Sequence, residues 1–326
     1  MNAGRRQRGV ALIMVLWLTI MLTVIGAGFA YGMRNEALAA RNGVSIAQAR
    51  AIADGAVYRT VFELLRPKIS PDVWVSDGSA HEWVADGARI SVTALDESGK
   101  IDLNAVPDEI LKGLLRTAAK LDDDRIAHLV DAIGDWRDAD DFRRPNGAEA
   151  QDYKTAGSPF LPANAAFESV PELQRVLGMT PAIYAAIADS LTVHSHQAGV
   201  NPLYATRNAL MALPGATAEV IDRYIAERDA AIKARTPPPA FPLSVGTGAL
   251  NLWRIRATVT MDDGVRFVRE AVIRPGDQRR LLTVLEWQDA TQGSASTPPA
   301  ANAAPDANAT PAANTAATGN AYAGIR

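Results

Sequence analysis

The order of apolar and polar positions first indicates one very long helix at the start of the chain. From Gly9 to Met33 no residue carries a charge, and most are apolar. Between residues 49 and 65 the apolar residues recur every three or four positions, which is typical of an amphipathic helix. Pro67 and Pro71 end this pattern. We therefore expect one helix from Val10 to Leu65, roughly 80 Å long at 1.5 Å per residue.

Strand patterns occur in two places that are far apart in the sequence. His81–Asp86 and Arg89–Leu95 flank an Asp86-Gly87 turn, which is a strong hairpin signal. Three further strands are predicted at residues 250–261, 265–273 and 281–287. We expect one antiparallel sheet that is interrupted by an insertion and lies against the amphipathic half of the long helix.

The insertion, residues 100–235, reads as helical and contains a weak repeat of apolar helix, turn and apolar helix. The last copy, around Pro214-Gly215, is closest to a helix-hairpin-helix, a module that can hold DNA phosphates on backbone N–H groups. However, the turn lacks a second glycine, and the insertion has 20 acidic and 15 basic side chains. Because phosphate contacts require positive charge, we expect a packing scaffold and no nucleic-acid binding.

The apolar block at the start of the chain is long enough to cross a bilayer, which takes about 20 helical residues. It is longer than the core of a cleaved secretory signal, and it continues into more helix. Arg5, Arg6 and Arg8 precede it. Since basic flanks stay on the cytoplasmic side, we expect a single-pass anchor with the bulk of the chain outside the cytoplasm.

Composition adds a few exclusions. The chain has 326 residues, a formal net charge of −3 and no cysteine, which suggests about two domains and excludes disulfides and thiolate chemistry. The four histidines show no triad or zinc spacing, and no Gly-rich phosphate loop is present. We therefore expect no enzymatic activity. Residues 290–326 are rich in Ala, Thr, Pro and Asn, and we expect them to be disordered.

The most chemically distinctive stretch is an acidic one, Asp135-Trp136-Arg137-Asp138-Ala139-Asp140-Asp141, followed by Glu149 and Asp152. Alternating aspartates before a glutamate resemble a calcium loop in residue type, although the EF-hand register is absent. The alternative is a solvated helix end that nearby arginines neutralise. The residues alone leave both interpretations open.

The start of the chain resembles a known class. The run Arg8-Gly9-Val10-Ala11-Leu12-Ile13-Met14 is similar to the prepilin cleavage region of type IV pilins and type II secretion pseudopilins. The resemblance implies that a prepilin peptidase cuts after Gly9 and that Val10 becomes the N-methylated first residue. The class usually has glutamate at the fifth mature position, which here is Met14. A carboxylate in lipid is costly unless it is paired, and a subunit with none above it needs no such pair.

A second series of motifs resembles the K-type minor pseudopilins of type II secretion. In chain order these are Asp-Trp-x-Asp-x-Asp from Asp135, Gly147-Ala148-Glu149, and the segments starting at Asn164 and Gly178. This resemblance implies a pseudopilin sheet with a helical insertion, and calcium bound in the insertion. The implied ligands are Asp135, Asp138, Asp140, Glu149 and Asp152, with Asn146 as a weaker candidate. The chain departs from the family at Ala150-Gln151-Asp152-Tyr153, where an acidic residue usually follows the glutamate directly.

The predicted fold class is therefore α+β. The predicted segments are a leader at 1–9, a transmembrane helix at 10–33, a pseudopilin domain at 34–99 and 241–289, an all-α insertion at 100–240, and a tail at 290–326. The resemblance implies a protein of the bacterial inner membrane with a periplasmic C-terminal domain. It would cap the pseudopilus tip with minor pseudopilins I and J, followed by H, and support export. The alternatives are a type IV pilus tip pilin and a membrane-anchored helix-hairpin-helix protein that binds DNA.

Overall fold

The computed structural model describes residues 8–67, 73–243, 248, 250–276 and 281–290. Most of the predicted leader and nearly all of the predicted disordered tail lie outside the described residues. The elements are α1 (Arg8–Leu65), β1 (Asp77–Ala85), β2 (Ala88–Asp96), η1 (Glu97–Gly99), β3 (Ile101–Asp102), α2 (Asp108–Thr117), α3 (Asp123–Arg137), α4 (Ala150–Thr155), η2 (Val170–Arg175), α5 (Pro181–Ile187), η3 (Ala188–Ser190), β4 (Leu191–Thr192), α6 (Arg207–Met211), α7 (Ala218–Ala234), β5 (Trp253–Met261), β6 (Arg266–Pro275) and β7 (Leu282–Asp289).

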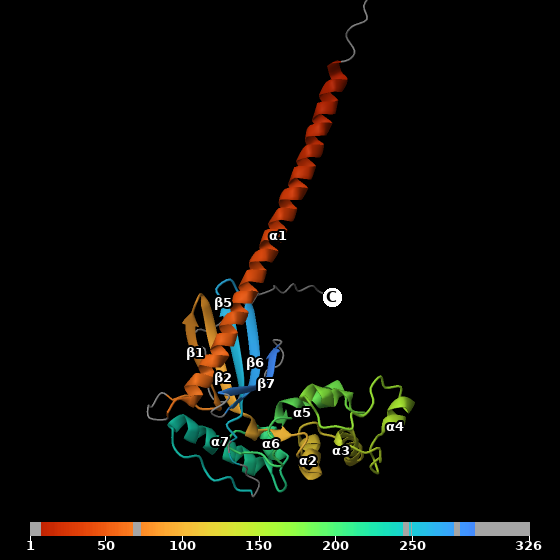
Figure 1. The fold of residues 1–326 in the computed structure, drawn as a ribbon, viewed down its shortest axis with the longest axis vertical. Helices are drawn as coiled ribbons and strands as arrows, with labels where there is room; N and C mark the ends of the chain where they lie inside the picture. The colour runs from red at the N-terminus through yellow and green to blue at the C-terminus, as the bar shows by residue number, and fades with distance from the viewer. Residues whose placement is uncertain (1–7, 68–72, 244–247, 249, 277–280, 291–326) are drawn as a thin grey trace, which may run out of the picture.

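Helix α1 is one continuous rod, which confirms the predicted long helix (Figure 1). Its first half extends away from the rest of the molecule, and its second half lies on the sheet. One stripe of the second half is fully buried against the sheet, as the three- and four-residue spacing predicts. The members of this stripe are Ala49, Ala53, Ala56, Val57 and Val61.

The sheet has five antiparallel strands in the order β1-β2-β5-β6-β7. Strands β2 and β5 pair along their full length, from Ala88 opposite Met261 to Asp96 opposite Trp253. This pairing confirms that an insertion interrupts one sheet. The β1–β2 hairpin turns at Asp86 and Gly87, whose φ angles of 53° and 71° are those of a type I′ turn.

The insertion folds around a hydrophobic cluster of its own, separate from the cluster between α1 and the sheet. Its largest fully buried side chains include Trp136, Tyr153 and Leu173. The insertion departs from the predicted all-helical composition at one place, where β3 and β4 form a short parallel pair. These two-residue strands join the start of the insertion to the segment that follows η3 within it, and they are too short to produce an alternating pattern in sequence.

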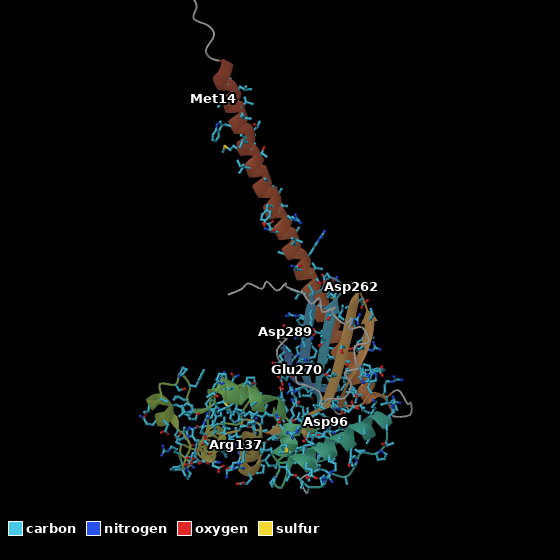
Figure 2. The ribbon with its side chains drawn as sticks, turned by 180° about the vertical axis from the view of Figure 1, so that it is seen from behind. Met14, Asp96, Arg137, Asp262, Glu270 and Asp289 are labelled. Atoms are coloured by element: carbon cyan, nitrogen blue, oxygen red, sulfur yellow. The ribbon has the colours of Figure 1, made fainter. Side chains whose placement is uncertain are left out.

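Figure 1 shows that the insertion lies at the end of the sheet opposite to the N-terminus of α1. The order along the long axis is therefore the free half of α1, then the helix–sheet layer, then the insertion. Asp96, which is labelled in Figure 2, marks the end of the sheet that meets the insertion, and Glu270 lies about halfway along β6.

A buried ion cluster joins the sheet to the insertion at this junction. The guanidinium of Arg254 on β5 contacts three carboxylates: Nε lies 2.6 Å from Glu97 Oε1, Nη1 lies 2.6 Å from Glu270 Oε1, and Nη2 lies 3.1 Å from Glu286 Oε2. Glu97 is fully buried, and Lys100 Nζ lies 3.3 Å from its Oε1. The insertion thus begins within a charge cluster whose other members belong to the sheet.

The charge state of Glu97 makes this junction sensitive to acid. Burial alone would raise the pKa of Glu97, but Arg254 and Lys100 together lower it well below its ordinary value. A lowered pKa means that the carboxylate stabilises the folded state above the unfolded-state pKa of about 4.3. That contribution is lost as the pH falls through the lower pKa of the folded state.

We therefore expect Glu97→Gln to lower the free energy of unfolding by about 3–5 kcal/mol at neutral pH, because Lys100 and Arg254 lose a buried partner. Thermal unfolding of the full chain in neutral detergent, followed by circular dichroism, measures this difference. The difference should shrink below about pH 4.3. The control is Glu82→Gln at an exposed position of β1. Equal melting temperatures at pH 7, or a difference that grows on acidification, would contradict the prediction.

Candidate functional site

The first turn of α1 contains Arg8, Gly9 and Val10, the residues on which the predicted cleavage site rests. Met14, in place of the usual glutamate, follows about one turn later and is 68% exposed. Figure 2 shows Met14 near the far end of α1, remote from the sheet and from the insertion. Cleavage after Gly9 and methylation of Val10 stay predictions.

Among the described residues, α1 is the one helix long and apolar enough to cross a membrane. Its most apolar stretch of 18 residues has a mean hydropathy of 2.4, and none of that stretch is buried within the protein. Large side chains such as Leu12, Trp17 and Phe29 are each more than 70% exposed. A surface of this kind is stable in hydrocarbon, and α1 is therefore a single-pass membrane anchor.

The second candidate site is the acidic loop, which we define as residues 135–153. It begins in the last turn of α3, where the Asp135 side chain is fully buried. The backbone N–H of Arg144 donates to both Asp135 oxygens, at 3.1 and 3.3 Å. Gly147 packs so closely that a Cβ there would overlap the Asp135 carboxylate, and only glycine fits. Burial raises the pKa of Asp135.

Glu149 is the least compensated carboxylate in the loop. It precedes α4, is 8% exposed, and neither carboxylate oxygen has a hydrogen-bond partner of good geometry among the described residues. Burial, and then the charge of Asp135, raise the pKa of Glu149. Asp138, at the C-terminal end of α3, has one buried unpaired oxygen, Oδ1, and burial followed by the charge of Asp140 raises its pKa.

Arg144 provides the positive charge that lies nearest to Asp135 and Asp138. Its Nε lies 3.8 Å from Asp135 Oδ1 and 3.8 Å from Asp138 Oδ2, while its Nη1 contacts Asp108 Oδ2 at 3.1 Å. The Arg144 side chain is one-third exposed, so this compensation is partly screened by solvent. Arg144 does not pair with the Glu149 carboxylate, which has no counter-ion among the described residues.

The remaining predicted ligands form local loop contacts. Asp140 Oδ1 accepts from the N–H of Phe142 at 2.9 Å. Asp152 Oδ2 accepts from the N–H of Glu149 at 3.0 Å, and Asp152 Oδ1 pairs with Arg143 at 3.2 Å. The side chain of Asn146, the weaker candidate, donates to Asp131 at 3.0 Å. The predicted set therefore divides into Asp135, Asp138 and Glu149, which are buried or have unpaired oxygens, and residues that shape the loop.

One residue of this site was missed by the sequence reasoning. Asn164 has a left-handed φ of 47°, and its Nδ2 donates to Asp141 Oδ1 at 2.8 Å. Its Oδ1 is buried without a partner. The signal in the sequence was an asparagine, which tolerates this conformation, but its separation from Asp141 along the chain hid their contact.

The unpaired buried atoms of the site are all oxygens: Asp138 Oδ1, both oxygens of Glu149, and Asn164 Oδ1. A hard cation such as Ca²⁺ prefers six to eight oxygen ligands, so the chemistry of this donor set fits calcium. As the side chains are placed, no three His, Cys, Asp or Glu side chains of the described residues are grouped closely enough to hold a metal ion. Coordination would thus require side-chain rotation towards a shared centre.

A long apolar N-terminal helix packed on an antiparallel sheet defines a pilin-like protein, and the helical insertion distinguishes a particular branch of that class. Residues 88–196 match the family model described as type II secretion system (T2SS), protein K. That range runs from β2 through the acidic loop to the residues that follow β4.

Similar proteins carry the same description. The chain is 28% identical over 234 residues to type II secretion system protein K of Klebsiella pneumoniae, covering 64% of this chain and 70% of that protein. It is 25% identical over 244 residues to protein K of Pseudomonas aeruginosa, covering 67% and 72%. A chain in the crystal structure of the GspK–GspI–GspJ complex from enterotoxigenic Escherichia coli has the same fold. Its TM-score is 0.54 at 16% identity, over 79% of this chain and 99% of that chain.

The chain is similar to the protein K family of type II secretion systems, and these comparisons support a minor pseudopilin of that kind. This confirms the resemblance to the K-type family and the predicted fold, in which a helical insertion interrupts a pseudopilin sheet.

Proposed function

We propose that the protein caps the tip of the type II secretion pseudopilus and thereby supports pseudopilus assembly and protein export across the outer membrane. The observation that carries this proposal is the position of the insertion. It lies at the end of the sheet opposite to the N-terminus of α1 (Figure 1). In a fibre whose subunits join by their parallel N-terminal helices, bulk at that end occupies the place of a next subunit.

Met14 supports the same position in the fibre. A glutamate at this depth of the membrane is costly unless a neighbouring N-terminal ammonium pairs with it. A subunit at the tip has no subunit above it and gains nothing from such a pair. The apolar Met14 removes the cost.

The proposed partners are the minor pseudopilins I and J, with H following below them. The structure of similar fold is a complex of GspK with GspI and GspJ. In this chain, the part of α1 near the sheet exposes large apolar side chains that a neighbouring helix could cover: Tyr58 is 52% exposed, Phe62 is 65% exposed and Leu65 is 51% exposed. They recur at helical spacing, so they share one face. The proposed role of the protein is structural rather than catalytic.

We expect the full chain, solubilised in neutral detergent, to co-elute with the I and J proteins of the same system in gel filtration. Phe62→Glu should weaken this association at least about tenfold, because it places a charge in the covered apolar face. The matched control is Phe142→Glu, at an exposed phenylalanine in the acidic loop. Failure of the wild-type chain to bind I and J, or equal loss in both variants, would refute the proposed interface.

The proposed location is the bacterial inner membrane, with the N-terminus in the cytoplasm and the C-terminal domain in the periplasm. Arg5, Arg6 and Arg8 support this orientation, since basic residues stay on the cytoplasmic side. A prepilin peptidase would then cut after Gly9 and methylate Val10.

Intact-mass and N-terminal peptide analysis of the protein purified from its membrane should show a chain that starts at N-methylated Val10. Gly9→Leu, or loss of the peptidase, should leave Met1 or its successor as the first residue. Gly26→Leu, at a helical glycine with open space around it, is the control and should not change processing. Any other mature start would exclude the pilin-like pathway.

We further propose that the acidic loop binds calcium through Asp138 and Glu149, with Asp135 and the Asn164 side-chain oxygen close to the ion. The support is the set of unpaired buried oxygens of Asp138, Glu149 and Asn164, the last of which contacts the acidic loop through Asp141. The cation would neutralise carboxylates whose pKa values are already raised by burial. Asp140 and Asp152 would orient the loop around it.

Calcium at 100 times its dissociation constant should stabilise the folded chain by about 2.7 kcal/mol, seen as a rise in melting temperature relative to EDTA. The Asp138→Ala/Glu149→Ala variant should lose this rise. Asp124→Ala, at an exposed position of α3, should retain it. An unchanged rise in the double variant would refute this ligand set, and no rise in the wild-type chain would refute calcium binding.

The geometry of the helix-hairpin-helix-like module does not favour the DNA-binding alternative. Arg207 pairs with Asp222 at 2.6 Å, and Arg223 pairs with Glu219 at 2.9 Å. Arg228 is buried and donates to the carbonyl oxygens of Pro202 and Ala205. Cations already engaged in this way are poorly placed to neutralise phosphates.

A further inference from the structure

A cleft of about 680 Å³ lies between the sheet and the insertion. Four consecutive residues of β7, from Leu285 to Gln288, line one wall. Residues 168–171 and the Tyr184–Asp189 region of the insertion line the opposite wall. Because consecutive strand residues point to opposite faces of a sheet, a cleft touching all four reaches the edge of β7. Arg254 of β5 and Glu270 of β6 also line it, so the cleft continues over one face of the sheet. Figure 1 shows β7 as an outer strand beside the insertion.

The edge of β7 presents unused backbone groups to this cleft. In the described part of the sheet, β7 pairs only with β6. The N–H of Ala290 donates to the carbonyl oxygen of Val268 at 3.0 Å, which makes these two residues a hydrogen-bonded pair. Such pairs alternate along antiparallel strands, so Glu286 and Gln288 direct their backbone groups towards β6. The backbone groups of Trp287 and Asp289 therefore point outward.

The cleft has an excess of negative charge. Its two permanent cations, Lys100 and Arg254, are both buried and are engaged with Glu97, Glu270 and Glu286. His194 Nε2 lies 3.3 Å from Glu286 Oε2. The other two lining carboxylates, Glu168 and Asp189, are exposed and form no ion pair with any described residue. Two carboxylates without a direct ion pair among the described residues thus line the cleft, and Asp189 is within electrostatic reach of Lys100 and Arg254.

We propose that this cleft binds an extended, cationic segment of a partner protein, which adds to β7 as a sixth strand. The backbone of the segment hydrogen-bonds to Trp287 and Asp289, as in other cases of strand addition. Its lysine or arginine side chains pair with Glu168 and Asp189. Its intervening apolar side chains contact Leu285, Val170 and Tyr184, which line the same cleft.

A defined peptide tests this proposal on the full chain in neutral detergent. The probe is a fluorescein-labelled heptapeptide of alternating lysine and valine, and binding is measured by fluorescence anisotropy. Two control peptides separate charge from strand pairing. The first alternates glutamate and valine, and the second has proline in place of each valine, so that it cannot extend a ladder.

We expect saturable binding of the lysine–valine peptide only. Glu168→Lys/Asp189→Lys should weaken it at least about tenfold, because each reversal replaces attraction with repulsion. The matched variant is Glu82→Lys/Glu227→Lys, with the same change in net charge at exposed positions on β1 and α7, and it should bind normally. Hydrogen exchange should slow at the amides of Trp287 and Asp289 when the peptide binds.

The proposal is overturned if the lysine–valine peptide does not saturate, or if both double variants lose binding equally. It is also overturned if the proline peptide binds as well, or if exchange slows on β1 instead of β7. Trp287 of the cleft is in ring contact with Tyr58 of the exposed apolar face of α1, whereas Glu168 and Asp189 belong to the insertion and are not part of that face. Association with I and J should therefore persist in Glu168→Lys/Asp189→Lys, and failure of this proposal leaves the proposed tip role standing.

Discussion

The contact on which the architecture depends is the bridge from Arg254 to Glu97, Glu270 and Glu286. One guanidinium holds carboxylates from the first residue after β2 and from β6 and β7. Glu97 also pairs with Lys100 and accepts a hydrogen bond from Thr192 Oγ1, both of which belong to the insertion. Because a buried charge is costly when it loses its partner, neither side of this junction can move away without leaving an uncompensated ion. The junction therefore fixes the insertion beyond one end of the sheet. Both the proposed capping role and the cleft beside β7 follow from that placement.

The sequence predicted the elements of the host domain well, because each has a strong local pattern. The buried stripe of α1 has helical spacing, and the strands alternate between buried and partly exposed residues. The Asp86-Gly87 turn fixed the first hairpin. The pairing of β2 with β5 across the insertion was also predictable, since two incomplete sets of strands must share one sheet to bury their apolar faces.

The junction itself was not predictable in the same way. Arg254, Glu97 and Glu270 are ordinary polar positions in a strand or turn pattern, and no periodicity shows that they meet. The β3–β4 pair has only two residues per strand, which is too short for a pattern. Both features arise from tertiary contacts between segments that are far apart in the sequence, so local propensity carries no information about them.

In the acidic loop, too, the sequence predicted where the candidate site lies but not which of its oxygen atoms are hydrogen-bonded. Residue types alone identified the stretch as a candidate site for a hard cation. They did not show that Asp140 and Asp152 accept hydrogen bonds from the N–H groups of Phe142 and Glu149. Nor did they show that the Glu149 carboxylate is buried with no hydrogen bond of good geometry among the described residues. Aspartates near a helix end compete for backbone N–H groups, and only the folded chain decides which oxygens stay free. Asn164 joins the site through the fold and not through a sequence motif.

The central claim is that the insertion ends the fibre, and the location of the protein in assembled pseudopili tests this claim most directly. Immunogold labelling of the insertion, with the major pseudopilin labelled as a reference along the fibre, resolves the location by electron microscopy. Our account predicts that gold for this protein is found at one end of each pseudopilus. Gold distributed along the shaft would contradict it, because a subunit with this insertion would then have neighbours on both sides.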